Sequence, residues 1–353
     1  MKKTTALFSI LLLLVFTSCS TQTDEEPKTQ TDQEKTPSEE EDNTTNEKDP
    51  NATPIERHGA LQVKGNRLTD KDGDVVQLRG MSLFWSQWQG KYFNNNTISW
   101  LTEEWGIDII RAAMGVDHGG YIENPETEIA KVENAVQSAI DNGIYVIIDY
   151  HSHEASKDPQ SAVAFFGLMA EKYADVPNVI YEIYNEPLAD DWKTVLFPYS
   201  EKVIAAIRAH DPDNLILCGT RTWSQRVDEV VEKPLNDPNV AYVLHFYAGT
   251  HTADLRKIAD KAMVNNLCLF VSEFGVINAD GDGDIDYEET KLWMKWMDDN
   301  QLSWCNWAVS DKDEGASIFK PGTSAEVKPL ESDLTESGLY LRNILLNRNY
   351  DKP

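Results

Sequence analysis

The chain has 353 residues, of which 41% are hydrophobic and 10% aromatic, so it can bury the core of one large domain or of two ordinary ones. Its 59 acidic residues outnumber its 32 basic residues, and the formal net charge is −27. This charge argues against nucleic-acid binding, which needs a basic face, whereas a neutral polymer is compatible with an acidic surface.

Residues 1–19 have the pattern of an export signal. Lys2 and Lys3 precede an apolar run, Ala6 to Phe16, that is too short to span a bilayer. The run leads through two small residues to Cys19, as in a bacterial lipobox, and acidic residues follow closely. We expect lipidation of Cys19 and export to the outer membrane or cell surface. The alternative is a secreted protein with an ordinary cleavage site and an incidental cysteine.

Residues 20–54 are rich in Thr, Glu, Ser, Pro and Asn and contain almost no apolar side chain, which predicts a disordered acidic tether. From residue 55 to residue 353 the pattern is that of a folded domain. Apolar residues first alternate around Lys64-Gly65-Asn66 and Asp72-Gly73-Asp74, which are hairpin signals. We interpret this part as a small β-hairpin plug beneath a barrel.

Eight apolar, strand-like runs then alternate with amphipathic segments of helical length. The runs are Leu78–Leu83, Ile109–Met114, Tyr145–Tyr150, Val179–Tyr184, Leu215–Gly219, Val240–His245, Cys268–Ser272 and Ser303–Ala308. Strands that alternate with helices indicate βαβ units and a parallel sheet, and eight of them favour a closed (β/α)₈ TIM barrel. No Gly-x-Gly-x-x-Gly follows the first run, which weakens a dinucleotide-binding interpretation.

Two of these runs end on a carboxylate. Asn185-Glu186-Pro187 closes the fourth run, and Glu273-Phe274-Gly275 closes the seventh. Strands of a barrel bring their carboxyl ends to one mouth, where such barrels carry out their chemistry. Glycosidic bonds are broken by two carboxylates that flank the linkage, one protonated and one ionised. Glu186 would need apolar cover or a nearby like charge to stay protonated near neutral pH.

These motifs resemble glycoside hydrolase family 5, most closely its bacterial endo-β-1,4-glucanase (cellulase) branch. The resemblance runs from about residue 55 to the C-terminus and includes Arg79-Gly80-Met81-Ser82, Asp149-Tyr150-His151, Gly219 to Gln225, His245 to His251 and Asn306-Trp307. It implies that Glu186 is the acid/base and Glu273 the nucleophile, with retention of configuration.

The resemblance also implies polar roles around this pair. Asn185 would hold the sugar 2-hydroxyl, Tyr247 would orient Glu273, and His151 would contact the sugar beside the cleavage point. His245 would fix proton positions, with a buried core histidine as the alternative. Arg111 lies inside an apolar strand and needs a carboxylate partner, either Glu273 or one elsewhere.

Aromatic residues follow the first, fifth and eighth strands. Trp88, Trp223 and Trp307 suit stacking on the apolar faces of β-linked glucose, with core packing as the alternative. Tyr121, Lys312 and Glu314 match polar sugar contacts in the resembling enzymes. Phe84 stands where related cellulases often carry a histidine, so one sugar hydrogen bond is lost, and Trp85 or Gln87 would compensate.

A separate signal spans residues 278–289. Its oxygen-bearing residues have the spacing of a twelve-residue calcium loop, with Asn278, Asp280, Asp282, Asp286 and Glu289 as ligands. The alternative is a solvated acidic turn. Catalysis itself needs no cofactor. Cys218, Cys268 and Cys305 lie in apolar strand patterns and predict buried free thiols.

The sequence therefore predicts a monomeric, exported endo-β-1,4-glucanase that acts on cellulose-like β-glucans. The same chemistry on mannan, xyloglucan or mixed-linkage glucan is the alternative among enzymes. A non-catalytic, glycan-binding surface protein is the alternative from another class, and the presence of both Glu186 and Glu273 argues against it.

Overall fold

The computed structural model describes residue 49 and residues 51–352. Cys19, the predicted signal and most of the predicted tether lie outside the described residues. The folded part begins earlier than expected, because the side chain of Thr53 caps helix α1 (Pro54–His58) and the Ile55 N–H donates to the Gly143 carbonyl at 3.0 Å. Helix α1 thus starts one residue before the predicted boundary at residue 55, and its cap lies two residues before it.

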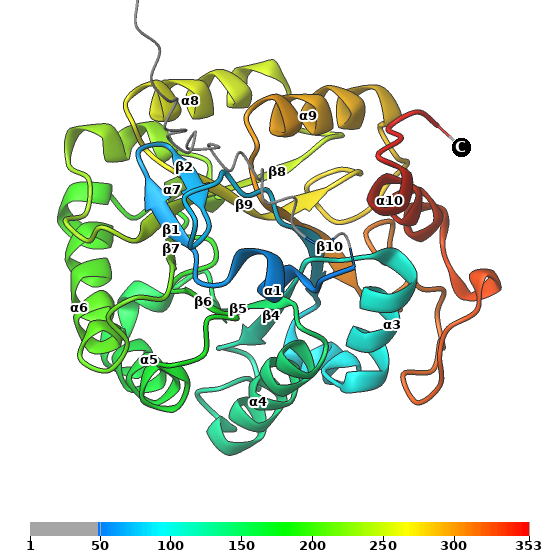
Figure 1. Cartoon of the computed structure of the whole chain (residues 1–353), viewed down its shortest axis with the longest axis horizontal. Coiled ribbons are helices and arrows are strands. Elements are labelled where there is room, and N and C mark those ends of the chain that lie inside the picture. The colour runs from blue at the N-terminus through cyan, green and yellow to red at the C-terminus, as the bar shows by residue number, and fades with distance from the viewer. Residues whose placement is uncertain (1–48, 50, 353) are drawn as a thin grey trace, which may run out of the picture. The chain divides into compact units, whose positions relative to one another are not determined.

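The core of the fold is a closed barrel of eight parallel strands, which confirms the predicted (β/α)₈ architecture (Figure 1). The strands follow one another around the barrel in sequence order, and the last pairs with the first. They are β3 (Arg79–Leu83), β4 (Ile109–Gly115), β5 (Tyr145–His151), β6 (Val179–Glu182), β7 (Ile216–Cys218), β8 (Val240–Tyr247), β9 (Leu269–Gly275) and β10 (Trp304–Val309).

Helices surround this barrel as an outer ring (Figure 1). The long ones are α3 (Asn95–Trp105), α4 (Pro125–Asp141), α5 (Pro159–Tyr173), α6 (Phe197–Arg208), α8 (Ala253–Val264), α9 (Tyr287–Asp299) and α10 (Glu336–Asn347). Two short ones, α2 (Ser86–Gln89) and α7 (Arg221–Ser224), follow β3 and β7. Helix α3 was not predicted, although Asn94 caps its start and Gly106, at φ +64°, ends it.

A hairpin closes one end of the barrel. β1 (Gln62–Lys64) pairs antiparallel with β2 (Arg67–Thr69), and the hairpin lies with α1 across the barrel in Figure 1. Leu61 and Leu68, beside and within it, belong to one buried cluster with barrel residues such as Ile109 and Val243. Burial of these leucines against the barrel interior confirms the predicted plug.

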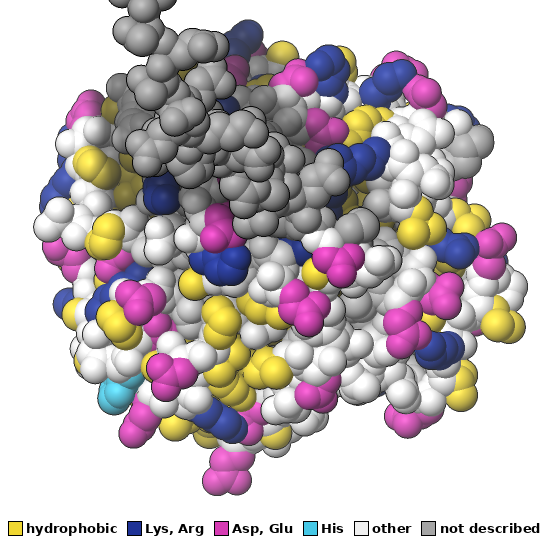
Figure 2. Space-filling view, viewed as in Figure 1, with side chains coloured by type: hydrophobic (Ala, Val, Ile, Leu, Met, Phe, Trp, Pro, Cys, Tyr) yellow, Lys and Arg dark blue, Asp and Glu magenta, His cyan; other side chains and the backbone are white. Residues whose placement is uncertain are grey.

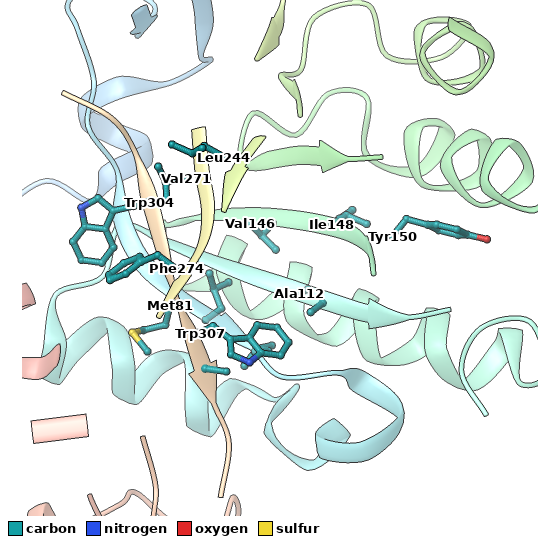
Figure 3. Close-up of a cluster of buried hydrophobic side chains, with 14 of the residues drawn as sticks. Met81, Ala112, Val146, Ile148, Tyr150, Leu244, Val271, Phe274, Trp304 and Trp307 are labelled. Carbon is teal, nitrogen blue, oxygen red and sulfur yellow. The ribbon is translucent and has the colours of Figure 1, made fainter. Parts of the chain in front are cut away.

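The remaining apolar side chains fill the space between strands and helices. Met81, Ala112, Val146 and Ile148 point outward from their strands into a large cluster, part of which is drawn in Figure 3. Because side chains alternate along a strand, the residues between them point into the barrel. This alternation decides which residues reach the site.

The surface mixes charges of both signs. Acidic and basic side chains are interspersed over the described part of the face in Figure 2. None of the helices formed by the described residues combines the length and apolar character needed to cross a membrane.

Candidate active site

The polar centre of the barrel is built directly on its apolar floor. Ile109, Ile147 and Val243 belong to the floor cluster. Two residues further along the same strands stand Arg111, Asp149 and His245, which point to the same side by strand alternation. Each of these three strands thus carries an apolar residue below and a polar residue above, so the layer of polar side chains lies directly over a layer of apolar ones.

Strand β9 departs from this alternation. Val243 of β8 pairs with Phe270, whereas His245, two residues on, pairs with Glu273, three residues on. The extra residue is a β-bulge, a feature that re-aims side chains near active sites. It lets Glu273 face the barrel interior although its neighbour Ser272 also does.

Glu186 lies in a loop just beyond β6, which ends at Glu182, two residues before the end of the predicted run. Its backbone N–H donates to the Ser152 carbonyl at 3.3 Å, and that of Asn185 donates to the Tyr150 carbonyl at 3.4 Å. The Ser224 hydroxyl donates to the Asn185 carbonyl at 2.7 Å. Backbone hydrogen bonds thus hold the loop from both sides, independently of the contacts that its side chains make.

The two predicted catalytic carboxylates meet at the barrel mouth. One carboxylate oxygen of Glu186, one of Glu273 and a ring nitrogen of His245 all lie within 4.8 Å of one another. Tyr247 donates its hydroxyl to Glu273 Oε1 at 2.7 Å, as predicted. Burial and the Glu273 charge raise the pKa of Tyr247 well above its ordinary value, so the phenol keeps the proton that it donates.

Arg111 is buried beneath Glu273 and contacts three carboxylates. Its guanidinium lies 2.8 Å from Glu273, 2.7 Å from Glu182 and 2.9 Å from Asp149, and it donates to the Asn185 side-chain oxygen at 2.6 Å. The side chain is 0% exposed. The expected pairing of Arg111 with Glu273 is confirmed. Because its side chain is buried below the cleft, Arg111 holds the nucleophile from underneath and does not itself reach a bound substrate.

The charges under the nucleophile are unequal. Burial raises the pKa of Asp149 well above its ordinary value, although Arg111 opposes this. Burial acts on Glu182 in the same direction, but Arg111 and His245 together outweigh it and lower the pKa of Glu182 to about 2. Glu182 therefore supplies the lasting counter-charge to Arg111.

The surroundings of Glu186 favour the ionised form of its carboxyl, whereas surroundings that keep it protonated were expected from the sequence. Burial alone would raise its pKa, but hydrogen bonds from His153 and His245 outweigh burial and hold the pKa of Glu186 well below its ordinary value. His245 Nδ1 lies 3.0 Å from Glu186 Oε1, and His153 Nε2 lies 3.2 Å from Oε2.

A cleft crosses the mouth on both sides of the pair. One lobe encloses roughly 530 Å³ and is lined by His153, Trp223, Gln225, Thr250 and His251 among others. The other encloses roughly 270 Å³ and contains the predicted His151, Asn185, Trp88, Trp307, Lys312 and Glu314. Glu186, Tyr247 and Glu273 line both lobes. A chain-like ligand can therefore extend in both directions from the reacting pair.

The rings of the second lobe are packed against one another. His151 stacks on Trp307 with centroids 5.1 Å apart and planes at 3°, and Trp85 meets His151 edge-on at 4.1 Å. Phe84 packs against Trp307 at 4.9 Å, so it contributes apolar area in this lobe. Trp85 lines the lobe, whereas the Gln87 amide donates to the Asp117 carbonyl.

Tyr121 is not among the residues that line the cleft. Its ring packs against Phe165 and Tyr150, with centroids 5.2 and 6.1 Å away, between the sheet and helix α5. The sugar contact expected at Tyr121 stays a prediction, and in this structure the loop after β4 turns the ring toward the core.

The five predicted calcium ligands do not form a cluster. Glu289 pairs with Arg256 at 2.5 Å, and Asp286 caps helix α9 by accepting the Glu289 N–H at 2.9 Å. Asp280 instead lines the cleft, and Asp282 accepts the Gly315 N–H at 3.2 Å. Residues 279–281 thus form a wall of the cleft. Among the described residues, only Glu186, His245 and Glu273 have metal-ligand spacing, and all three are already hydrogen-bonded as catalytic groups.

Sequence reasoning missed several polar residues. Glu182 and Ser272 lie within apolar strands, and this placement was the available signal. His245 Nε2 lies 2.9 Å from the Ser272 hydroxyl, which donates to Glu182 at 2.7 Å.

The three predicted buried free thiols, Cys218, Cys268 and Cys305, are confirmed.

Two carboxylates this close, at the mouth of an eight-stranded barrel, define a site for breaking glycosidic bonds. The family model "Cellulase (glycosyl hydrolase family 5)" matches residues 69–313. The chain belongs to glycosyl hydrolase family 5.

Individual relatives agree with this assignment. The chain is 47% identical to Endoglucanase Z of Dickeya dadantii, over 82% of this chain and 67% of that protein. It is 45% identical to Endoglucanase A of Evansella cellulosilytica, over 76% of this chain and 56% of that protein. The chain thus spans between about half and two thirds of the length of these curated relatives.

Solved structures match nearly over their full length. A structure from Cytophaga hutchinsonii is 49% identical, with a TM-score of 0.82, and 83% of this chain covers 96% of it. The catalytic domain of Thermobifida fusca endoglucanase Cel5A is 34% identical, with a TM-score of 0.80 and coverage of 83% and 99%. A variant of that domain was solved in complex with cellotetraose.

Proposed function

We propose that the protein is a retaining endo-β-1,4-glucanase that cleaves internal bonds of cellulose and related β-glucans. The observation that carries this proposal is the separation of at most 4.8 Å between one oxygen of Glu186 and one of Glu273. Retaining enzymes place their carboxyl groups about 5–5.5 Å apart, whereas inverting enzymes need about 6.5–9.5 Å to admit a water molecule.

The reaction follows from the positions of the two carboxyls. Glu273, held by Arg111 and Tyr247, attacks the anomeric carbon as its bond to the leaving oxygen breaks. Glu186 gives its proton to that oxygen. Water then attacks the anomeric carbon, passes one proton to Glu186 and releases Glu273. Two inversions give net retention, and the proton balance of Glu186 is restored.

The cleft supports attack at internal bonds. It continues past the reacting pair on both sides, with Trp223 in one lobe and Trp88 and Trp307 in the other. Trp88 is 55% exposed and Trp223 49% exposed, so their faces are free to stack on glucose rings. The endoglucanase names of the relatives favour β-1,4-glucan over mannan or xyloglucan.

Product analysis tests this function. Carboxymethyl-cellulose should lose viscosity well before reducing sugar accumulates, and barley glucan and glucomannan should be cleaved more slowly. Proton NMR at early times on cellopentaose should show a β-anomer as the first product. An α-anomer would overturn the retaining mechanism, and preferred cleavage of glucomannan would overturn the substrate.

We further propose that the enzyme is an exported lipoprotein held by Cys19, on the basis of the lipobox pattern at residues 16–19. Cys19→Ala should move the protein from the membrane fraction to the soluble fraction with unchanged specific activity. Wild-type protein that is soluble and unlipidated by mass spectrometry would overturn this proposal.

A further inference from the structure

His153 follows strand β5, and the reaction described above uses it neither as acid, base nor nucleophile. Its Nε2 lies 3.2 Å from Glu186 Oε2, and His245 Nδ1 lies 3.0 Å from Oε1 of the same carboxyl. Each oxygen of the acid/base therefore carries one imidazole.

The two imidazoles differ in exposure. The His245 side chain is 1% exposed and is fixed by Ser272, whereas the His153 side chain is 37% exposed and lines both lobes of the cleft. Oε1 of Glu186 thus faces the interior and Oε2 faces the cleft. The oxygen that protonates a glycosidic bond has to face the sugar chain, so it is the oxygen that His153 holds.

The backbone around His153 is tied to the same loop as Glu186. The Tyr184 hydroxyl donates to the His153 carbonyl at 3.0 Å, and the Glu186 N–H donates to the neighbouring Ser152 carbonyl at 3.3 Å. The Trp85 ring meets the His153 ring edge-on at 5.7 Å. This placement is specific although the side chain is partly exposed.

We propose that His153 is a positioning residue that holds the cleft-side oxygen of Glu186 while the cleft is empty and gives way to the glycosidic oxygen of a bound glucan. The proposal rests on the acid/base role of Glu186 proposed above. His153 neither gains nor loses a proton over the catalytic cycle, because Glu186 donates one proton and recovers one from water.

The charges around the pair determine the sign of its effect. The hydrogen bond to Glu186 raises the pKa of His153, against the effect of burial. The other titratable groups that face the pair are His151 and Asp149 from β5, His245 and Tyr247 from β8, Glu273 from β9, Asp117 after β4 and His251 after β8. A positive charge on His153 stabilises the ionised form of Glu186. Glu186 therefore loses its proton at a lower pH than it would beside a neutral side chain.

The test compares His153→Gln, which removes the charge, with His153→Arg, which makes it permanent. The kcat/KM of cellopentaose cleavage requires protonated Glu186 in the free enzyme. In His153→Gln the alkaline limb of the pH profile of kcat/KM should move to higher pH by about one unit or more. In His153→Arg the limb should not move upward. His210→Asn, at an exposed histidine beyond helix α6, is the matched control and should follow wild type.

A second substrate separates positioning from general damage. The leaving group of 2,4-dinitrophenyl β-cellobioside needs no proton, so its alkaline limb should coincide in all four proteins. Superimposable cellopentaose profiles for wild type and His153→Gln would overturn the inference, and so would equal shifts with both substrates. Wild-type protein that leaves cellopentaose intact would instead overturn the proposed function.

Discussion

Ser272 and Glu273 are adjacent in β9, yet both side chains face the barrel interior. Ser272 donates to Glu182 at 2.7 Å, while Glu273 receives the Tyr247 hydroxyl at 2.7 Å. Regular alternation would send one of them outward to the helices. The bulge in β9 therefore places the nucleophile Glu273 and Ser272, which contacts His245, in the same layer of the barrel interior.

The first prediction concerns the acid/base. Glu186→Ala should lower activity on cellopentaose by about 10²- to 10⁴-fold, because proton delivery is lost. Glu273 should still attack 2,4-dinitrophenyl β-cellobioside, and the glycosyl-enzyme should accumulate because no base activates water. Azide needs no deprotonation, so it should restore turnover and give a β-azide of retained configuration.

The matched variant removes the nucleophile. Glu273→Gly with azide should give an α-azide, because azide enters from the side that Glu273 occupied. The reverse pattern of products would mean that the two roles are exchanged.

The second prediction concerns the buried cation. Arg111→Met should lower the free energy of unfolding by about 3–5 kcal/mol, because it leaves buried carboxylates without a counter-charge. Glu182→Gln should cost less, because Arg111 keeps Asp149 and Glu273. Urea unfolding measures both. Arg226→Met, at a pair 34% exposed on the arginine side, should change stability by about 0–1 kcal/mol. Equal losses of stability in Arg111→Met and Arg226→Met would contradict the role of Arg111 as counter-charge to the buried carboxylates.

The third prediction concerns alkaline pH. Burial would lower the pKa of His245, but the Glu182 carboxylate 3.7 Å from Nε2 and the hydrogen bond with Glu186 raise it from 6.5 to about 9. A raised folded-state pKa contributes stability that is complete below the unfolded value and is lost as pH rises through the folded value. The free energy of unfolding should therefore fall between about pH 6.5 and pH 9. His245→Gln should flatten this part of the curve, and an unchanged slope would refute the pairing.

The fourth prediction concerns the turn after β7. Thr222, Trp223 and Ser224 all have positive φ, between +53° and +59°, which is unfavourable for residues other than glycine. Bonds to the acid loop hold the turn, because Trp223 N–H donates to the Pro187 carbonyl at 3.0 Å and the Ser224 hydroxyl donates to that of Asn185. The turn thus couples the exposed Trp223 to the catalytic loop.

Ser224→Ala should therefore cost about 1–3 kcal/mol of stability, because it leaves buried polar groups without a partner. It should also lower kcat on cellopentaose more than it raises KM. Ser99→Ala, which breaks an exposed hydrogen bond to Glu103, is the control and should change neither. Wild-type kcat in Ser224→Ala would show that the bond to Asn185 is dispensable.

The fifth prediction concerns calcium. Because Glu289 is paired with Arg256 and Asp286 caps α9, the melting temperature should be equal in a chelator and in millimolar calcium chloride. Differential scanning calorimetry measures this. A ligand that binds only the folded state raises stability by mass action, so a higher melting temperature in calcium would reinstate the loop as a metal site.

The sequence reveals the barrel because its evidence is periodic. Eight apolar runs at regular intervals imply eight strands, and a carboxylate at the end of a run identifies Glu186 and Glu273. The bulge in β9 is set by pairing with both neighbours and leaves no local signal, so the shared orientation of Ser272 and Glu273 was not predictable.

Other contacts depend on the fold in a similar way. The path of the loop after β4 decides which way the Tyr121 ring points. Arg111 was correctly expected to need a carboxylate, but its burial and its three partners depend on contacts between residues far apart in the chain. His153 gave no signal, because a histidine after a strand is informative only once Glu186 stands beside it.

The surplus of carboxylates around Arg111 has a consequence for engineering. When Glu273 is replaced by glycine or alanine, Arg111 still has Glu182 and Asp149 as partners, so the barrel keeps a compensated interior. The nucleophile can thus be removed with little loss of folding, while the cleft keeps its rings on both sides. Such a variant, supplied with an α-glycosyl fluoride of cellobiose, would run the chemistry toward assembly and join glucan chains that it can no longer cut.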